Sequence, residues 1–251
     1  MLTPAFSTVA CREWTLDRVA LAAQRLGFGA VELRTFGVDS RAFACDPAMT
    51  DAAKVRRLFA DAGVSVCSLA TGVSFDEVVK PQLLGYVFGD QEVGVRAGRR
   101  AVDLAASIEC PMVRMFGFRL QPRENEGKRR FAGVARVVAR LAKVVEHASK
   151  TGVKVAFENG GSFGTSAQML EVIDEIRSPL LVASYNVAAA QAAGERPVEG
   201  VARLAAAGSL GMLRVKDVHH GRPVVLGTGE VAVRDAVTAA AKVVTGGAQF
   251  R

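Results

Sequence analysis

Residues 153–161, VKVAFENGG, indicate both the fold and a candidate site of this chain. The apolar beginning is typical of a short buried strand, which ends at a carboxylate, Glu158, followed by Asn159 and two glycines. Burying an ionised carboxylate without a partner is costly, and glycines after a strand let the backbone turn sharply or approach a ligand closely. We therefore expect Glu158 to be the centre of a site that other strands complete. A strand-end glutamate that points into water is the alternative.

Apolar strands alternate with amphipathic helices along the rest of the chain. Strands are expected at residues 5–10, 30–34, 64–70, 111–117, 153–158, 180–186 and 211–216. Helices are expected at residues 16–26, 46–61, 91–108, 128–150, 165–176, 197–207 and 231–243, with a long charged loop at 118–130 and a small hairpin within 219–229. Seven such units without a composition shift predict one α/β domain over residues 1–251.

The number of units favours a (β/α)8 TIM barrel whose strand 8 is short or missing, because residues 246–251 are too few for a clear eighth strand. An open, doubly wound sheet is the alternative. No GxGxxG follows the first strand and no GxxxxGK[ST] occurs, which disfavours a nucleotide-binding open sheet.

Composition indicates a globular protein without a membrane anchor. The 251 residues are 50% hydrophobic and 23% charged, no run of 18 apolar residues occurs, and the first residues do not form a basic-then-apolar leader. Four cysteines lie far apart without a CxxC pair, which is typical of reduced thiols. We expect a cytoplasmic protein.

The net charge of +7 fits a nucleic acid, an anionic small molecule or no specific partner. The densest basic segment is the helix expected at 128–150, where Arg136, Arg140 and Lys143 fall on one face. We interpret this face as solvated, with a nucleic-acid surface as the alternative, and expect neither a nucleic acid nor a membrane as partner. A homo-oligomer stays open.

In a barrel the carboxyl ends of the strands meet around one mouth. The polar residues at these ends are Glu32, Arg34, Arg114, Glu158, Asn186, Arg214, Lys216 and Asp217.

Several motifs resemble the sugar phosphate isomerase/epimerase family, the xylose isomerase-like TIM barrels. They are LGFGAVELR, GVKVAFENGG, TSAQMLEVIDEIRSP, GERPVEG, LRVKDV and LGTGEV, in this order along nearly the whole chain. The resemblance implies a TIM barrel that uses a divalent metal (Mn, Mg, Co or Zn) to move a proton next to a sugar carbonyl.

Carried over residue by residue, the resemblance leaves the family's metal site incomplete. Glu158 matches the ligand of the fifth strand, whereas Asn186 stands at the aspartate of the sixth, with Ala189 three residues on. Arg214 stands at the position of the histidine ligand of the seventh strand. The chain stops about where the eighth strand, which ends in a glutamate in the family, would begin. A guanidinium has no lone pair for a metal. We expect no metal or other cofactor, with Glu158 and Asn186 the only candidate ligands.

The catalytic assignment uses Glu158 as the base, with Arg214 and Lys216 stabilising the charge that develops on the carbonyl oxygen. Arg214 is expected beside Glu158, either as an internal salt bridge or as an anion-binding group. Substrate contacts are assigned to Arg34, Asn186, His219 and His220. As alternatives, the two histidines are solvated loop residues, and Lys216 forms a structural pair with Asp217.

The sequence thus predicts an isomerase or epimerase of a sugar or sugar phosphate, with its need for a metal left open. A non-catalytic barrel that binds a small anionic ligand or a partner subunit is the alternative. The resemblance also extends to abasic-site endonucleases, which hold several zinc ions with many histidines; three histidines in the chain disfavour that function.

Overall fold

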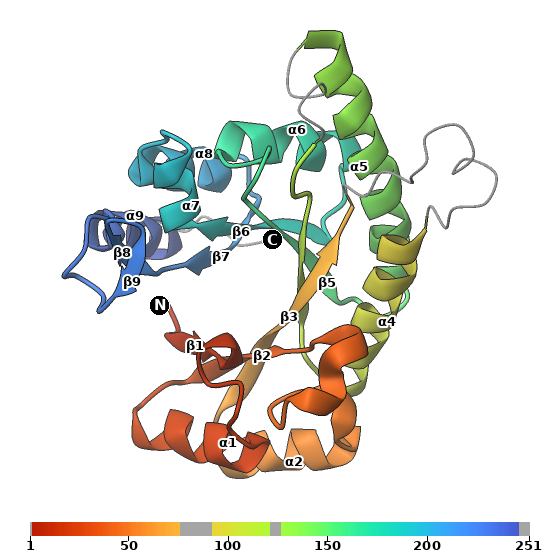
Figure 1. Cartoon of the computed structure of the whole chain (residues 1–251), viewed down its shortest axis with the longest axis vertical. Coiled ribbons are helices and arrows are strands. Elements are labelled where there is room, and N and C mark those ends of the chain that lie inside the picture. Colours follow the sequence, from red (N-terminus) through yellow and green to blue (C-terminus); the bar gives the residue numbers. More distant parts are fainter. Residues whose placement is uncertain (1, 76–91, 121–126, 246–251) are drawn as a thin grey trace.

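Seven parallel strands lie side by side in chain order in the computed structural model of this protein. The structure describes residues 2–75, 92–120 and 127–245. The strands are β1 (Ala5–Ser7), β2 (Ala30–Arg34), β3 (Ser65–Ser74), β4 (Met112–Phe116), β5 (Lys154–Glu158), β6 (Leu181–Asn186) and β7 (Leu210–Arg214). Their sheet curls into an open barrel with the helices along its outer side (Figure 1). The predicted TIM-barrel class is confirmed.

Helices follow the strands, as the periodicity predicts. They are α1 (Leu16–Arg25), α2 (Ala52–Asp61), α4 (Val93–Ser107), α5 (Gly127–Ala148), α6 (Ser166–Ile176), α7 (Val187–Ala192), α8 (Pro197–Ala206) and α9 (Val233–Thr245). Thr15 caps α1, and Thr165 caps α6 in a capping box with Gln168. These side chains satisfy backbone N–H groups that have no partner inside the helix.

The strands are apolar along their length because both sides of the sheet are covered. In β5 the side chains of Val155, Ala156 and Phe157 are fully buried. For this reason the strands of a parallel sheet that is covered by helices have nearly continuous hydrophobic sequences. The change to Glu158 at the end of β5 therefore marks the point where the strand leaves the packed core.

Strand register brings the polar strand ends together. Phe116 of β4 pairs with Glu158, Glu158 pairs with Ser184 of β6, and Asn186 pairs with Arg214 of β7. We call the carboxyl ends of β2, β4, β5, β6 and β7 the mouth.

The sheet ends at β1 and β7 within residues 2–75, 92–120 and 127–245, without an eighth barrel strand. The chain after β7 instead forms a two-stranded antiparallel hairpin, β8 (Asp217–His219) with β9 (Arg222–Val224). This is the predicted small hairpin, begun two residues earlier. Residues 246–251 lie outside the described residues.

Two expected elements are interrupted by local side-chain hydrogen bonds. The strand predicted at 5–10 stops at Ser7, whose hydroxyl accepts from Val9 N, and a 3-10 turn, η1 (Thr8–Ala10), follows. The helix predicted at 46–61 divides into the 3-10 turn η3 (Pro47–Met49) and α2, because Asp51 caps a new start at Lys54 N. A further 3-10 turn, η2 (Gly37–Ala42), lies between β2 and η3.

Two boundaries and one additional helix also differ from the prediction. Strand β7 ends at Arg214, so Lys216 lies beyond the strand. The short helix α7 was not predicted; Asn186, the last residue of β6, starts it by accepting from Ala189 N. The loop predicted at 118–130 ends at Gly127, where α5 begins, and its residues 121–126 lie outside the described residues.

The predicted solvated face of α5 is partly a packing face. Arg140 donates from Nη1 to the backbone oxygen of Phe75 at 2.9 Å, and Lys143 pairs with Glu92. The face therefore holds the helix against the start of α4 and the end of β3. None of the described helices is both long and apolar enough to cross a membrane, and all four cysteines are free thiols.

Candidate active site

Two glutamates and two arginines form a closed set of ion pairs at the mouth. Arg114 places Nη1 2.6 Å from Glu158 Oε2 and Nε 3.3 Å from Glu32 Oε2. Arg214 reverses the pattern, with Nη1 2.5 Å from Glu32 Oε2 and Nε 3.3 Å from Glu158 Oε2. Each carboxylate therefore meets both guanidiniums through one oxygen. We call these four residues the mouth cluster.

Glu158 is fully engaged by its neighbours. Its second oxygen, Oε1, accepts from Nδ2 of Asn186 at 2.9 Å. The Asn186 amide is fixed in this orientation because its Oδ1 accepts from Ala189 N, and only the oxygen of an amide can accept. Asn159 holds the strand ends together by accepting from Asn186 N at 2.5 Å and donating to the Gly164 carbonyl at 2.9 Å.

The mouth cluster is buried, and its arginines and glutamates face one another. The side chains of Arg114, Glu32 and Glu158 are 5%, 4% and 6% exposed. Burial by itself would raise the pKa of Glu32, but Arg114 and Arg214 outweigh it and hold this pKa below the ordinary value. Burial would lower the pKa of Arg214, and Glu32 and Glu158 outweigh that effect and raise it. The mutual attraction of the groups thus offsets the cost of removing them from water.

One carboxylate oxygen of the mouth cluster has no close partner. Within the described ranges, Glu32 Oε1 is buried and takes part in no hydrogen bond of ordinary geometry, and the nearby Ser7 hydroxyl helps to lower the Glu32 pKa. An unpaired buried carboxylate oxygen costs free energy. It is therefore available to accept a hydrogen bond from a hydroxyl group of a ligand.

Arg34 adds a third guanidinium beside the mouth cluster. It is half-buried, lies over the ring of Phe36 at 5.4 Å, and forms no ion pair within residues 2–75, 92–120 and 127–245. Burial and the positive charge of Arg114 lower its pKa. Gly72 gives it room, because a Cβ there would lie 3.0 Å from Nη2. Arg34 is thus a cation that Glu32 and Asp46 attract without a direct ion pair among the described residues.

The remaining predicted residues lie on the rim after β7. Lys216 is exposed, and the predicted pair with Asp217 does not form. The Asp217 carboxylate instead accepts from the backbone N–H groups of Val218, Gly227, Gly229 and Val231. These contacts leave Asp217 without a free oxygen.

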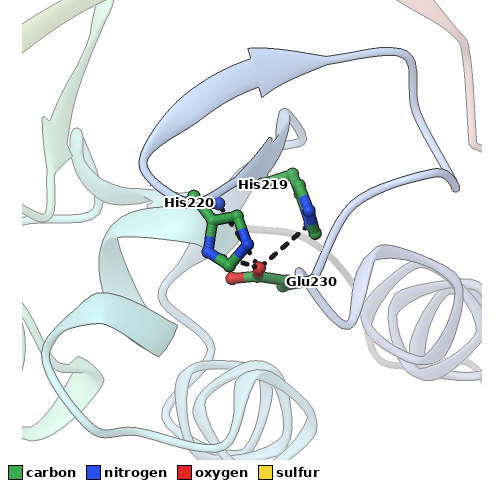
Figure 2. A group of neighbouring side chains, drawn as sticks. All are labelled: His219, His220 and Glu230. Atoms are coloured by element: carbon green, nitrogen blue, oxygen red, sulfur yellow. Dashed lines mark hydrogen bonds and ion pairs between the residues drawn. The ribbon is translucent and has the colours of Figure 1, made fainter.

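His219 and His220 are exposed on this rim and are both directed at Glu230 (Figure 2). The structure therefore brings Glu158, Asn186 and Arg214 into direct contact and places Arg34 beside them, whereas the two histidines form a separate group. Their assignment as substrate contacts stays a prediction.

Sequence reasoning did not assign Glu32 and Arg114 to the site. Both stand among the polar strand-end residues of the sequence, but the resemblance implied a role for neither of them. Charge balance is the sequence signal that would have included them. Glu158 and Arg214 form one ion pair, and Glu32, a second buried glutamate, requires a second cation such as Arg114.

A family model described as xylose isomerase-like TIM barrel matches residues 20–242. The protein belongs to this family. The predicted membership is thereby confirmed, and the open barrel is a xylose isomerase-like barrel with seven described strands. A search of curated proteins found no match.

Solved structures share the fold at low sequence identity. An L-ribulose 3-epimerase is 20% identical, with 97% of this chain and 78% of that chain covered and a TM-score of 0.75. A probable 3-DHS dehydratase, AsbF from Bacillus anthracis, is 15% identical, with 96% and 89% covered and a TM-score of 0.75. The IOLI protein with a binding zinc atom is 13% identical, with 96% and 85% covered and a TM-score of 0.75.

The residues of this xylose isomerase-like barrel do not fit the divalent metal of its family. Both glutamates direct Oε2 at two guanidiniums, and Glu158 Oε1 is taken by Asn186. The Asn186 oxygen, a candidate ligand from the sequence, is turned to Ala189 N. A hard divalent ion requires several oxygen or nitrogen ligands with compensating charge, and Glu32 Oε1 alone is not such a set.

Proposed function

We propose that this protein binds a sugar derivative with an anionic group, of the sugar-phosphate class, at the mouth and isomerises or epimerises it by proton transfer next to the carbonyl. Arginine supplies the positive charge that a divalent metal supplies in the family. The family membership and neighbours such as an L-ribulose 3-epimerase and a D-allulose 3-epimerase from Methylomonas sp. support the reaction class.

The observation that carries the proposal is a third guanidinium, Arg34, beside the mouth cluster. Glu32 and Glu158 form ion pairs with Arg114 and Arg214, whereas Arg34 is attracted by Glu32 and Asp46 but forms no ion pair with a described carboxylate. A phosphate or carboxylate group beside Arg34 would form such an ion pair, and the planar guanidinium suits these oxyanions. The lowered pKa of Arg34, caused by burial and by Arg114, supports the same conclusion.

We assign the roles from the contacts of Glu158 and Arg214 and from the position of Lys216 just after β7. Glu158 takes a proton from the carbon next to the carbonyl, and the electron pair left behind forms an enolate, whose oxygen Arg214 stabilises with help from Lys216. Returning the proton from Glu158 to the neighbouring carbon gives the isomer, whereas epimerisation needs a second group that delivers a proton to the opposite face. Glu32 Oε1 accepts from a sugar hydroxyl, and Asn186 orients Glu158. To act as the base, Glu158 must exchange one of its hydrogen bonds for the substrate.

The need for Glu158 to give up a hydrogen bond before it can act as a base favours a second candidate function, binding without catalysis. Because both Glu158 oxygens already have partners, the mouth also suits a non-catalytic barrel that binds a small anionic ligand. Among the described residues no further strand pairs with the sheet edges at β1 and β7, and a partner subunit could pair with them in that case. The two functions share the anion site and differ only in chemistry.

Ligand binding is tested by thermal shift and calorimetry with metal-stripped protein and a panel of ketose phosphates and their unphosphorylated sugars. We expect phosphorylated ligands to stabilise the protein more strongly than the free sugars, and Arg34→Met to remove this difference. Arg196→Met is the matched control, since Arg196, the N-cap residue of α8, is 81% exposed and forms an ion pair with Glu199 alone among the described residues. No stabilisation by any phosphorylated ligand would refute the anion site.

Catalysis is tested by solvent deuterium incorporation into the ligands that bind. The isomerase proposal predicts incorporation that Glu158→Gln abolishes while binding persists. Binding without incorporation in the wild-type protein supports the non-catalytic function, and incorporation that persists in Glu158→Gln removes Glu158 from the role of base.

A further inference from the structure

Three side chains with metal-ligating atoms converge on the rim of the mouth, outside the mouth cluster. His219 ends β8, His220 follows it in the turn, and Glu230 lies in the segment before α9 (Figure 2). His219 Nδ1 lies 3.0 Å and His220 Nδ1 lies 3.6 Å from the same oxygen, Glu230 Oε1. One ligand atom from each of the three residues lies within 4.8 Å of the other two.

The backbone holds these three residues in place. The Asp217 carboxylate accepts from Gly227 N and Gly229 N at 2.8 and 2.9 Å, which ties the β8–β9 hairpin to the segment that carries Glu230. Glu230 N donates to the Val218 carbonyl at 2.9 Å, and Gln191 of α7 donates to the Glu230 carbonyl at 2.7 Å. The ligand geometry is therefore set by a hydrogen-bonded frame.

The spacing fits a small divalent ion. Zinc bonds of about 2.0–2.1 Å in a tetrahedron place neighbouring ligand atoms about 3.3 Å apart. The two histidine–glutamate distances, 3.0 and 3.6 Å, lie on either side of that value. Two imidazoles and one carboxylate form a donor set that zinc uses with further positions open to water. The side chains are 53%, 82% and 50% exposed, so an ion reaches them from solvent.

We propose that His219, His220 and Glu230 bind a divalent transition-metal ion of the zinc type. The ion links the β8–β9 hairpin to the segment before α9, and water completes its coordination. The site is separate from the family's metal position at Glu158, and it stands whether or not the mouth binds a sugar phosphate.

The test is titration of the metal-stripped protein with Co²⁺ and Zn²⁺, followed by visible absorption and calorimetry. We expect one equivalent of Co²⁺ with d–d bands and no thiolate charge-transfer band, because the cysteines take no part. His219→Ala, His220→Ala and Glu230→Gln should each weaken binding by more than the roughly 10–100-fold that loss of an outer-sphere partner costs. Zn²⁺ at about 100 times its Kd should raise Tm by roughly 5–11 °C.

The third histidine of the chain provides a matched control. His147 lies on α5 with Nε2 2.6 Å from Asp103, and His147→Ala should leave binding unchanged. Absence of saturable binding in the micromolar range would overturn the proposal. So would binding that survives His219→Ala and His220→Ala together, or binding that only Glu158→Gln removes, because that ion would occupy the mouth.

Discussion

Removal of Arg114 tests whether the mouth cluster works as one buried electrostatic unit. In Arg114→Met the long apolar part of the side chain is kept and the charge is lost. Glu158 then keeps one ion pair, the 3.3 Å contact with Arg214 Nε, beside its hydrogen bond from Asn186, and Glu32 loses its second guanidinium. Breaking a buried ion pair by removing one partner costs about 3–5 kcal/mol, which for a chain of this size lowers Tm by roughly 6–20 °C.

The pH dependence of this loss gives the prediction its direction. The folded-state pKa of Glu32 lies below its ordinary value of 4.5; burial opposes this shift, and Arg114 is the largest of the groups that cause it. The carboxylate therefore contributes stability that is complete above about pH 4.5 and is lost as pH falls through the lower folded-state pKa. Without Arg114 the pKa of Glu32 rises, so the stability difference between wild type and Arg114→Met should narrow on acidification.

The assay is urea unfolding monitored by circular dichroism at pH 7 and in steps below pH 5. Arg196→Met, which removes a pair exposed by 81% and 52%, should cost no more than about 1 kcal/mol and change little with pH. A loss below about 1 kcal/mol for Arg114→Met at pH 7, or a difference that widens on acidification, would refute the cluster as a buried unit.

Two glycine substitutions test packing around the mouth and around helix α8. In Gly72→Ala the new Cβ lies 3.0 Å from Arg34 Nη2, so phosphate-ligand affinity measured by calorimetry should fall while the circular dichroism spectrum stays unchanged; unaltered affinity would place the anion elsewhere. Gly200→Ala puts a Cβ against the Tyr185 hydroxyl and should cost about 1–3 kcal/mol by overpacking. Gly160→Ala is the control for Gly200→Ala, because its Cβ meets no atom within 4 Å. Equal free energies of unfolding of Gly160→Ala and Gly200→Ala in urea would contradict the expected overpacking.

The fold was largely predictable because its signal is repeated. Each apolar run is buried on both sides of the sheet, and each amphipathic helix covers one part of it, so seven local patterns agreed on one architecture. Boundaries failed where a single side chain decided them. Asp51 restarts a helix that Asp46 and Pro47 begin, and Asn186 opens a helix directly at a strand end.

The candidate site was predictable in position but only partly in composition. Because Glu158, Asn186 and Arg214 each lie at a strand end, the sequence predicted that they come together. Their contacts follow from the register of β5, β6 and β7. The pairing of Glu32 with Arg214 depends on the curvature of the barrel, which brings these side chains of β2 and β7 into contact across the mouth. Local sequence does not encode that distance.

The central claim is that guanidinium groups replace the metal at this mouth. The most direct measurement is deuterium incorporation from D₂O into bound ketose phosphates, with metal-stripped protein in the presence of a chelator. We predict incorporation that the chelator leaves unchanged and that added Mn²⁺, Mg²⁺, Co²⁺ or Zn²⁺ does not increase. Incorporation that stops with the chelator and returns with one of these ions in wild type, but not in Glu158→Gln, would contradict the claim.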